Sequence, residues 1–229
     1  GFCLVGSEMC IRDRYNATSV EELSFEIGKN FEFDGGSNEQ LTTVIDKCPS
    51  YTLIMDKIGG KLSDSKILLL TRDYRAFCLS KMNKRNAKNN NIFRYTYIAY
   101  RWNHLAMAIL NLKKLFPERV MIVKYEDLVG DERERYIQQI CELFNVQYGD
   151  HMLAVEDKKV ESKIDFKNLS QRQSTKLTDL SKPINKSRIN AWKSELSPSM
   201  IRQLECICEE VGEEFCLLYT SDAADEGHC

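Results

Sequence analysis

The chain has 229 residues, 43% of them hydrophobic, which is enough for one α/β core of ordinary size. Its formal net charge of −2 excludes a general attraction to nucleic acid or anionic membranes, so any anion site must be local. No apolar run approaches the roughly 20 residues of a membrane-spanning helix, and we expect no membrane segment in this chain.

The two ends of the chain carry an unusual relationship at the DNA level. Residues 9–13 can be encoded by ATG TGT ATA AGA GAC, and the reverse complement of that DNA, read in another frame with flanking bases, encodes residues 216–221. Such an inverted repeat resembles sequencing adapters read through at both sides of a library insert. We therefore expect residues 1–14 and 216–229 to be non-native tails around a partial domain at 15–215.

Cysteine usage does not indicate a disulfide framework. Without the tails, the remaining cysteines are scattered, odd in number and without metal-site spacing: Cys48, Cys78, Cys141, Cys206 and Cys208. Cys206 and Cys208 stand two apart on a predicted helix and so face different ways. We expect buried, reduced thiols and no bound metal.

The first clear element of the middle segment is a strand. Residues 15–45 are polar and irregular, with a Gly-Gly-Ser-Asn breaker at residues 35–38. Residues 67–70 (Ile-Leu-Leu-Leu) form a short apolar run, which predicts a strand buried on both faces, as in a parallel sheet. A helix is predicted to begin near Asp73, because Asp is a good N-cap residue.

The strongest helical pattern covers residues 94–116. Its apolar residues recur at alternating steps of three and four: Tyr95, Ile98, Trp102, Leu105, Ile109, Leu112 and Phe116. Pro117 is predicted to end this helix, and residues 120–123 predict a second short buried strand. Because helices separate the two strands, we expect them to lie parallel in one sheet of an α/β fold.

Two more helices and a loop are predicted after the second strand. Asp131 and Glu134 resemble a capping box that opens a helix, with the inner face Ile137, Ile140, Cys141 and Phe144. Residues 150–190 are polar with little periodicity and are interpreted as a long loop. The last helix is predicted to have Ser197 as N-cap and Pro198 in its first turn, with the buried face Met200, Ile201, Leu204, Ile207 and Val211.

One strand-to-helix corner carries residues suited to anion binding. The first strand ends in Arg72 and is followed by a helix with Ser80 in about its second turn. Ligands of parallel sheets sit at the carboxyl ends of strands, where the next helix offers free N–H groups and an Arg offers a planar, bidentate donor to phosphate. Between Arg72 and Lys88, basic side chains outnumber acidic ones six to one. A solvated helix face would have the same composition, and this alternative stays open.

The segment from Arg72 to Ser80 resembles the 3′-phosphate-binding motif of sulfotransferases, which use 3′-phosphoadenosine 5′-phosphosulfate. In that family a strand-terminal Arg is followed eight positions later by a Ser, as here, and both side chains bind the 3′-phosphate. Residues 72–75 (Arg-Asp-Tyr-Arg) resemble the family's Arg-Asp-Pro-Arg form, with Tyr in place of Pro. The resemblance implies that Arg72 and Ser80 bind this co-substrate.

An upstream segment resembles the carbohydrate-type branch of the family. Residues 46–51 (Asp-Lys-Cys-Pro-Ser-Tyr) look like its Glu-Lys-Thr-Pro-x-Tyr segment, with Asp in place of Glu. The resemblance implies a catalytic Lys47 near the transferring sulfonyl group and a glycan or similar polyol or amine as acceptor. An ordinary surface lysine is the alternative that stays open.

Two downstream segments match the family in the same order. Residues 123–128 resemble its second core strand with the Tyr-Glu-Asp-Leu ending, which implies that Tyr125 lies beside the adenine. Residues 186–198 resemble the loop that closes over the nucleotide, which implies that Lys186 and Arg188 reach the 3′-phosphate. A core role for Tyr125 and a solvated loop for the two basic residues stay open, and for Trp192 we expect core packing.

The resemblance covers residues 45–215 and implies a P-loop-like parallel sheet flanked by helices, incomplete at the N-terminus. Nothing in residues 15–46 supplies the Lys- and Gly-containing phosphosulfate loop with which the family begins. We expect the general base to be missing with that loop, His104 and His151 to be bystanders, and this fragment to be inactive, although the resemblance implies a sulfotransferase as the parent protein.

Two functions of other kinds stay open. A P-loop nucleotide kinase would need a Gly-x-x-x-x-Gly-Lys-Ser/Thr loop upstream, and a non-catalytic nucleotide-binding or interaction domain would lack both loop and base. The missing disulfide pattern favours a cytoplasmic bacterial enzyme, and an upstream anchor would instead favour the Golgi lumen. The sequence leaves the acceptor and the oligomeric state undetermined.

Overall fold

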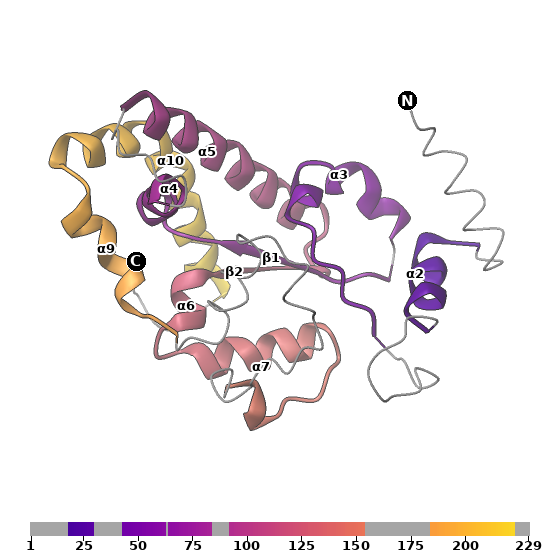
Figure 1. Cartoon of the computed structure of the whole chain (residues 1–229). Helices are drawn as coiled ribbons and strands as arrows, with labels where there is room; N and C mark the ends of the chain where they lie inside the picture. The colour runs from indigo at the N-terminus through magenta and orange to yellow at the C-terminus, as the bar shows by residue number, and fades with distance from the viewer. Residues whose placement is uncertain (1–17, 30–42, 63, 84–91, 154–183, 223–229) are drawn as a thin grey trace, which may run out of the picture. The chain divides into compact units, whose positions relative to one another are not determined.

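A computed structural model of the chain (Figure 1) describes the residues 18–29, 43–62, 64–83, 92–153 and 184–222. The chain divides into two compact units, residues 1–65 and 66–229. None of the helices in this described part combines the length and the apolar character that crossing a bilayer takes.

The first unit contains short helical elements: α2 (Val20–Lys29), η2 (Pro49–Leu53), α3 (Met55–Ile58) and η3 (Gly59–Lys61). The prediction that residues 15–45 are irregular is therefore wrong at α2. The helix begins there because Ser19 Oγ accepts the N–H of Glu22 at 3.0 Å, and a Glu22 carboxylate oxygen accepts the N–H of Thr18 at 2.6 Å. This pattern resembles a capping box, with Glu22 accepting the N–H one residue before Ser19, and the Ser-x-x-Glu spacing could have indicated it.

The second unit is built on two parallel strands, β1 (Ile67–Thr71) and β2 (Val120–Lys124), which pair in register from Ile67 opposite Val120 to Thr71 opposite Lys124. Two helices, α4 (Tyr74–Asn83) and α5 (Ile92–Leu115), lie between them in the chain. The expected parallel α/β arrangement is thus confirmed, and both strands end at the same edge of the sheet (Figure 1).

The expectation that the first strand is buried on both faces is wrong. Ile67 and Leu69 are 9% and 7% exposed, whereas Leu70, next to Leu69 in the same strand, is 59% exposed. Successive side chains of a strand point to opposite faces. Among the described residues, the face that holds Ile67 and Leu69 is buried at these two positions, and the opposite face is open at Leu70.

Helix α5 confirms the predicted stripe and its end before Pro117. Most of the predicted residues are buried, among them Tyr95, Trp102 and Leu112 at 3%, 5% and 1% exposure. The helix packs mainly against α10 (Pro198–Asp222) and α4, which cover its inner side (Figure 1). The core of the second unit therefore lies between α4, α5 and α10.

The remaining elements follow β2: α6 (Tyr125–Val129), α7 (Arg133–Leu143), η4 (Asp150–Met152) and α9 (Ser187–Glu195). Helix α7 was predicted, but its capping box is wrong, because no side chain caps its N-terminus. The Asp131 carboxylate instead accepts Lys186 Nζ, and Glu134 accepts the Tyr148 hydroxyl. On its inner face Cys141 is buried, while Ile137, Ile140 and Phe144 are half-buried.

The loop predicted for residues 150–190 is wrong from Ser187 onward, and residues 154–183 lie outside the described residues. Helix α9 begins there because Asn185 Oδ1 accepts both the N–H and the hydroxyl of Ser187, at 2.9 and 2.6 Å. An Asn side chain that binds the backbone two residues ahead turns the chain, which starts the helix.

Helix α10 begins as predicted, with Ser197 Oγ accepting the N–H of Met200 at 3.3 Å. Its buried face is formed by Leu204, Cys208 and Phe215, whereas the other predicted positions are half-buried. The five cysteines of the middle segment are free thiols, but the expectation that they are buried is correct only for Cys78, Cys141 and Cys208, because Cys48 is half-buried and Cys206 is exposed. Helix α10 continues past residue 216, where we expected a non-native tail to begin. That residues 216–229 and 1–14 are non-native stays a prediction, and residues 1–14 lie outside the described residues.

Candidate functional site

The corner after β1 begins helix α4 with an internal carboxylate. Asp73 Oδ1 accepts the N–H groups of Arg75 and Ala76 at 2.8 and 3.0 Å, which confirms Asp73 as the N-cap. Two of the amides that a bound anion could have used are therefore occupied. An anion at this corner would therefore have to be bound mainly by side chains, and Arg72 is the predicted one.

The backbone of Arg72 accepts a hydrogen bond from an aromatic side chain of the core. Trp102 on α5 is 5% exposed, and its indole Nε1–H donates to the carbonyl oxygen of Arg72 at 3.0 Å. The same indole meets Tyr74 edge to face, with 5.5 Å between ring centroids. The end of β1 is thus attached to the helical core through a hydrogen bond and a ring contact.

The guanidinium of Arg72 is held by groups from two other elements. Its Cζ lies 4.2 Å from the centre of the Tyr125 ring, and its Nη2 donates to the carbonyl oxygen of Arg188 at 2.7 Å. The side chain is 19% exposed, and its Nε has no hydrogen-bond partner among the described residues. The structure therefore brings together Arg72, Tyr125 and the backbone of Arg188.

Glu126 is a site residue that the sequence reasoning missed, although it stands within the Tyr-Glu-Asp-Leu segment. Its Oε1 accepts the N–H of Asp73 at 3.2 Å and lies 3.8 Å from Arg72 Nε, while its buried Oε2 has no partner among the described residues. Burial raises the pKa of Glu126, and the hydrogen bond from Asp73 and the charge of Arg72 oppose this shift. A carboxylate thus sits where it can compete with an incoming anion for Arg72.

No described interaction joins the side chains of the other predicted phosphate ligands to the Arg72 side chain. Ser80 is half-buried in the second turn of α4, and no described interaction links it to Arg72. Lys186 Nζ donates to Asp131 at 2.5 Å and lowers the pKa of that carboxyl. The side chain of Arg188 is exposed. Their roles as ligands stay predictions.

Lys47 belongs to the first unit, where it is exposed just before η2. The turn around it is closed by the N–H of Tyr51, which donates to the Cys48 carbonyl at 3.0 Å, and by a hydrogen bond between the Tyr51 and Asp46 side chains. This bond raises the pKa of Tyr51. The catalytic role of Lys47 stays a prediction.

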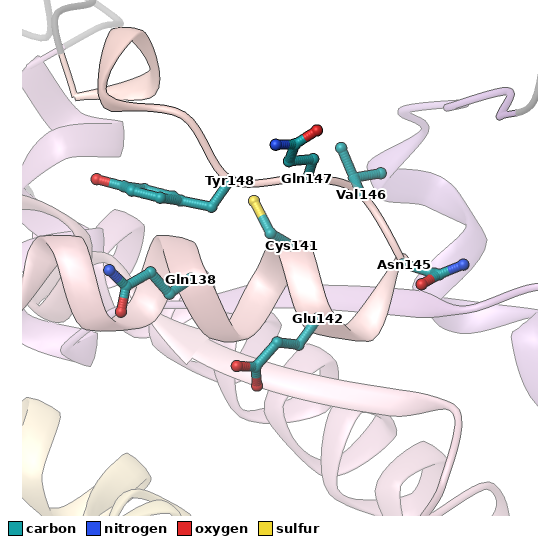
Figure 2. Close-up of a pocket in the computed structure, with 7 residues that line it drawn as sticks. All are labelled: Gln138, Cys141, Glu142, Asn145, Val146, Gln147 and Tyr148. Carbon is teal, nitrogen blue, oxygen red and sulfur yellow. The ribbon is translucent and has the colours of Figure 1, made fainter.

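Two hollows among the described residues of the second unit could hold a ligand. One, of about 540 Å³, is lined only by α7 and the segment after it (Figure 2) and holds no predicted site residue. The other, of about 390 Å³, is flanked by the strand-end corners and α9, and its lining residues are Asp73, Arg75, Glu126, Ile189, Asn190, Trp192 and Lys193. Arg72 does not line the second hollow, but the lining residue Glu126 lies 3.8 Å from Arg72 Nε, and we therefore take this smaller hollow as the candidate site.

The candidate site draws on neither a metal cluster nor a histidine. No group of three or more potential metal ligands occurs in the part of the chain that the structure describes. His104 and His151 are both exposed. The candidate site is therefore an arrangement of arginine, aromatic and carboxylate side chains.

Comparison with known proteins identifies the family whose sequence and fold this chain resembles. A sequence model of the sulfotransferase family matches residues 15–150, which is more than half of the chain, and no curated protein matches it. The sulfotransferase domain from the Synechococcus PCC 7002 olefin synthase is 23% identical with a TM-score of 0.52, over 71% of this chain and 57% of that domain. The sulfotransferase domain from the curacin biosynthetic pathway is 21% identical with a TM-score of 0.50, over 76% of this chain and 65% of that domain.

These two likenesses concern the fold, because the identities are low. The chain spans less than two thirds of the length of either domain. The family match covers β1, β2 and the helices between them, which carry Arg72 and Tyr125. This chain belongs to the sulfotransferase family.

Proposed function

We propose that the protein transfers a sulfonyl group from 3′-phosphoadenosine 5′-phosphosulfate to a hydroxyl or amine of a glycan or similar polyol. In this proposal the described residues bind the 3′-phosphate end of the donor. The observation that carries it is the Arg72 guanidinium, stacked on Tyr125 at the shared carboxyl edge of two parallel strands.

The hydrogen bonding of Arg72 supports a phosphate ligand. The Nε–H is buried without a hydrogen-bond partner among the described residues, and Nη2 donates to a neutral carbonyl. A phosphate oxygen would satisfy the Nε–H, because charge-assisted, bidentate bonds are the strongest that a guanidinium forms. The Tyr125 ring is engaged by Arg72, and adenine would lie at its remaining surface or edge.

The proposed chemistry is a substitution at sulfur. A base takes the proton of the acceptor hydroxyl or amine, the new bond to sulfur forms, and the bond between sulfur and the 5′-phosphate oxygen breaks. Adenosine 3′,5′-bisphosphate leaves with the electron pair of that bond. Positive groups stabilise the charge that builds on the leaving phosphate, and Lys47 is our candidate for this task.

A transfer assay tests the proposal. The gene with its upstream sequence would be expressed and incubated with donor labelled in the sulfate and with a panel of glycans, polyols and amines. We expect labelled product with the wild type, loss of product in Arg72→Ala, and wild-type activity in Arg202→Ala, which alters an exposed arginine of α10. Unchanged transfer by Arg72→Ala would rule out the site.

The same preparation distinguishes the other functions. Binding of adenosine 3′,5′-bisphosphate without transfer to any acceptor would favour a non-catalytic nucleotide-binding domain. Phosphoryl transfer from ATP would favour a kinase. Either outcome would contradict the proposed reaction.

A further inference from the structure

Arg75 connects three helices around the candidate site without belonging to the predicted phosphate ligands. Its Cζ lies 4.0 Å from the centre of the Trp192 ring on α9 and 4.9 Å from the centre of the Tyr74 ring on α4. Rings of two different helices therefore contact one guanidinium, and such cation–π contacts are stronger where water is partly excluded. The Arg75 side chain is 25% exposed.

Two carboxylates complete the surroundings of Arg75. Its Nη2 lies 2.7 Å from Asp73 Oδ2, and its Nη1 lies 3.4 Å from Glu205 Oε1 on α10. Asp73 is also the cap of α4, and its own N–H donates to Glu126. The arginine is thus attached to the capping carboxylate at one side and to α10 at the other.

Helix α9 connects the contact between Arg75 and Trp192 to the proposed phosphate site. Arg188 stands four residues before Trp192, so both are on the same side of this helix. The carbonyl oxygen of Arg188 accepts Arg72 Nη2 at 2.7 Å. A shift of α9 away from Arg75 would remove the acceptor that now orients the Arg72 guanidinium.

We propose that Arg75 is a positioning residue: by holding Trp192 and α9 against α4, it keeps the Arg188 carbonyl on Arg72 and so aligns Arg72 for the 3′-phosphate. This inference rests on the proposed function. Arg75 lines the candidate hollow, and in this inference it acts through α9 rather than as a ligand of the phosphate. A lysine at this position would keep one charge near Asp73, but it lacks the planar group that lies over the rings and reaches both carboxylates.

The test compares two nucleotides that differ in the 3′-phosphate. Affinities of adenosine 3′,5′-bisphosphate and adenosine 5′-monophosphate would be measured by titration calorimetry for the wild type and Arg75→Lys, with Arg202→Lys as the matched control. We expect Arg75→Lys to weaken bisphosphate binding by about tenfold, with monophosphate affinity unchanged within about twofold. The control should retain both wild-type affinities.

A second variant keeps the inference testable if Arg75→Lys lowers stability. Trp192→Leu leaves both ion pairs of Arg75 in place and removes only the ring on α9, so it should reduce selectivity for the 3′-phosphate similarly. The double variant should lose no more selectivity than either single variant, because both act through one contact.

The outcomes separate this inference from the proposed function. If the wild type does not prefer the bisphosphate, the proposed function fails and the inference fails with it. If the wild type does prefer it, but Arg75→Lys and Trp192→Leu keep the wild-type ratio of affinities or lose both affinities equally, Arg75 is only structural and the inference alone is overturned.

Discussion

The corner after β1 and the start of α9 both carry basic side chains predicted for one phosphate, yet their surroundings differ. The Arg72 side chain is 19% exposed, and an aromatic ring and a carbonyl oxygen hold its guanidinium. The Lys186 side chain is 61% exposed and pairs with Asp131, which is 94% exposed. The Arg72 guanidinium is therefore partly buried and held in one orientation, whereas the Lys186 ammonium forms an ion pair with an acid on the surface.

This difference separates two contributions to anion binding. A partly buried guanidinium in a fixed orientation can distinguish the geometry of its ligand, because its bonds are charge-assisted and poorly screened. An exposed lysine attracts anions through water, so its attraction is weak and is reduced further by salt. We therefore expect Arg72 to set selectivity and Lys186 to add a small, salt-dependent increment.

Replacing Arg72 should have the largest effect. Arg72→Ala should lower the affinity for adenosine 3′,5′-bisphosphate by about 100-fold, as expected for the loss of a bidentate, charge-assisted contact. Titration calorimetry at moderate salt measures this change, with Arg202→Ala as the control. An affinity within a factor of about three of the wild type would contradict the proposed role.

Replacing Trp102 should have an intermediate effect. Trp102→Phe keeps an aromatic ring but removes the donor to the Arg72 carbonyl, and we expect unfolding free energy to fall by about 1–3 kcal/mol. Urea denaturation followed by circular dichroism measures it. Bisphosphate affinity should fall less than in Arg72→Ala, since the guanidinium remains, and a larger fall would mean that the strand end matters more than the side chain.

Glu126 gives a prediction of opposite sign. Because burial raises its pKa in the folded state, Glu126 contributes stability below its unfolded pKa, and this contribution is lost as pH rises through the folded pKa. Glu126→Gln should therefore gain stability relative to the wild type as pH rises from acid to neutral, and should bind the bisphosphate about threefold more tightly at neutral pH. Denaturation series across this pH range check the first effect. A difference that stays constant with pH would contradict it.

Removing Lys186 should have the smallest effect. We expect Lys186→Ala to weaken bisphosphate binding by less than about threefold at low salt and to have no effect near 0.5 M NaCl, roughly where the screening length falls below 5 Å. Affinities measured across a salt series show this. A large loss that persists at high salt would mean that Lys186 leaves Asp131 and contacts the phosphate directly.

Local patterns predicted much of the second unit. Residues close in sequence determine three of the confirmed features, which are the Asp73 cap, the apolar stripe of α5 and the Ser197 cap. The order of elements along the chain determines a fourth, the parallel pairing of β1 and β2. Contacts between distant segments could not be predicted in this way. Asp131 pairs with Lys186, 55 residues away, and α7 begins after Glu132 with no side-chain cap, so the expected capping box is not formed.

Only some residues of the candidate site could be predicted, because the others come together through contacts between distant segments. Spacing and family resemblance indicated Arg72 and Tyr125, which the structure brings into contact. The use of the Arg188 backbone rather than its side chain depends on where α9 lies, and a sequence pattern carries no such information. The competing carboxylate of Glu126 depends on the pairing of the two strand ends.

We propose that Arg72 binds the 3′-phosphate, and a structure with adenosine 3′,5′-bisphosphate tests this assignment most directly. We expect the 3′-phosphate within hydrogen-bonding distance of the Arg72 guanidinium, on the side of the Nε–H that has no hydrogen-bond partner among the described residues. A nucleotide bound in the hollow beside α7 (Figure 2), or one whose 3′-phosphate lies away from Arg72, would contradict the claim.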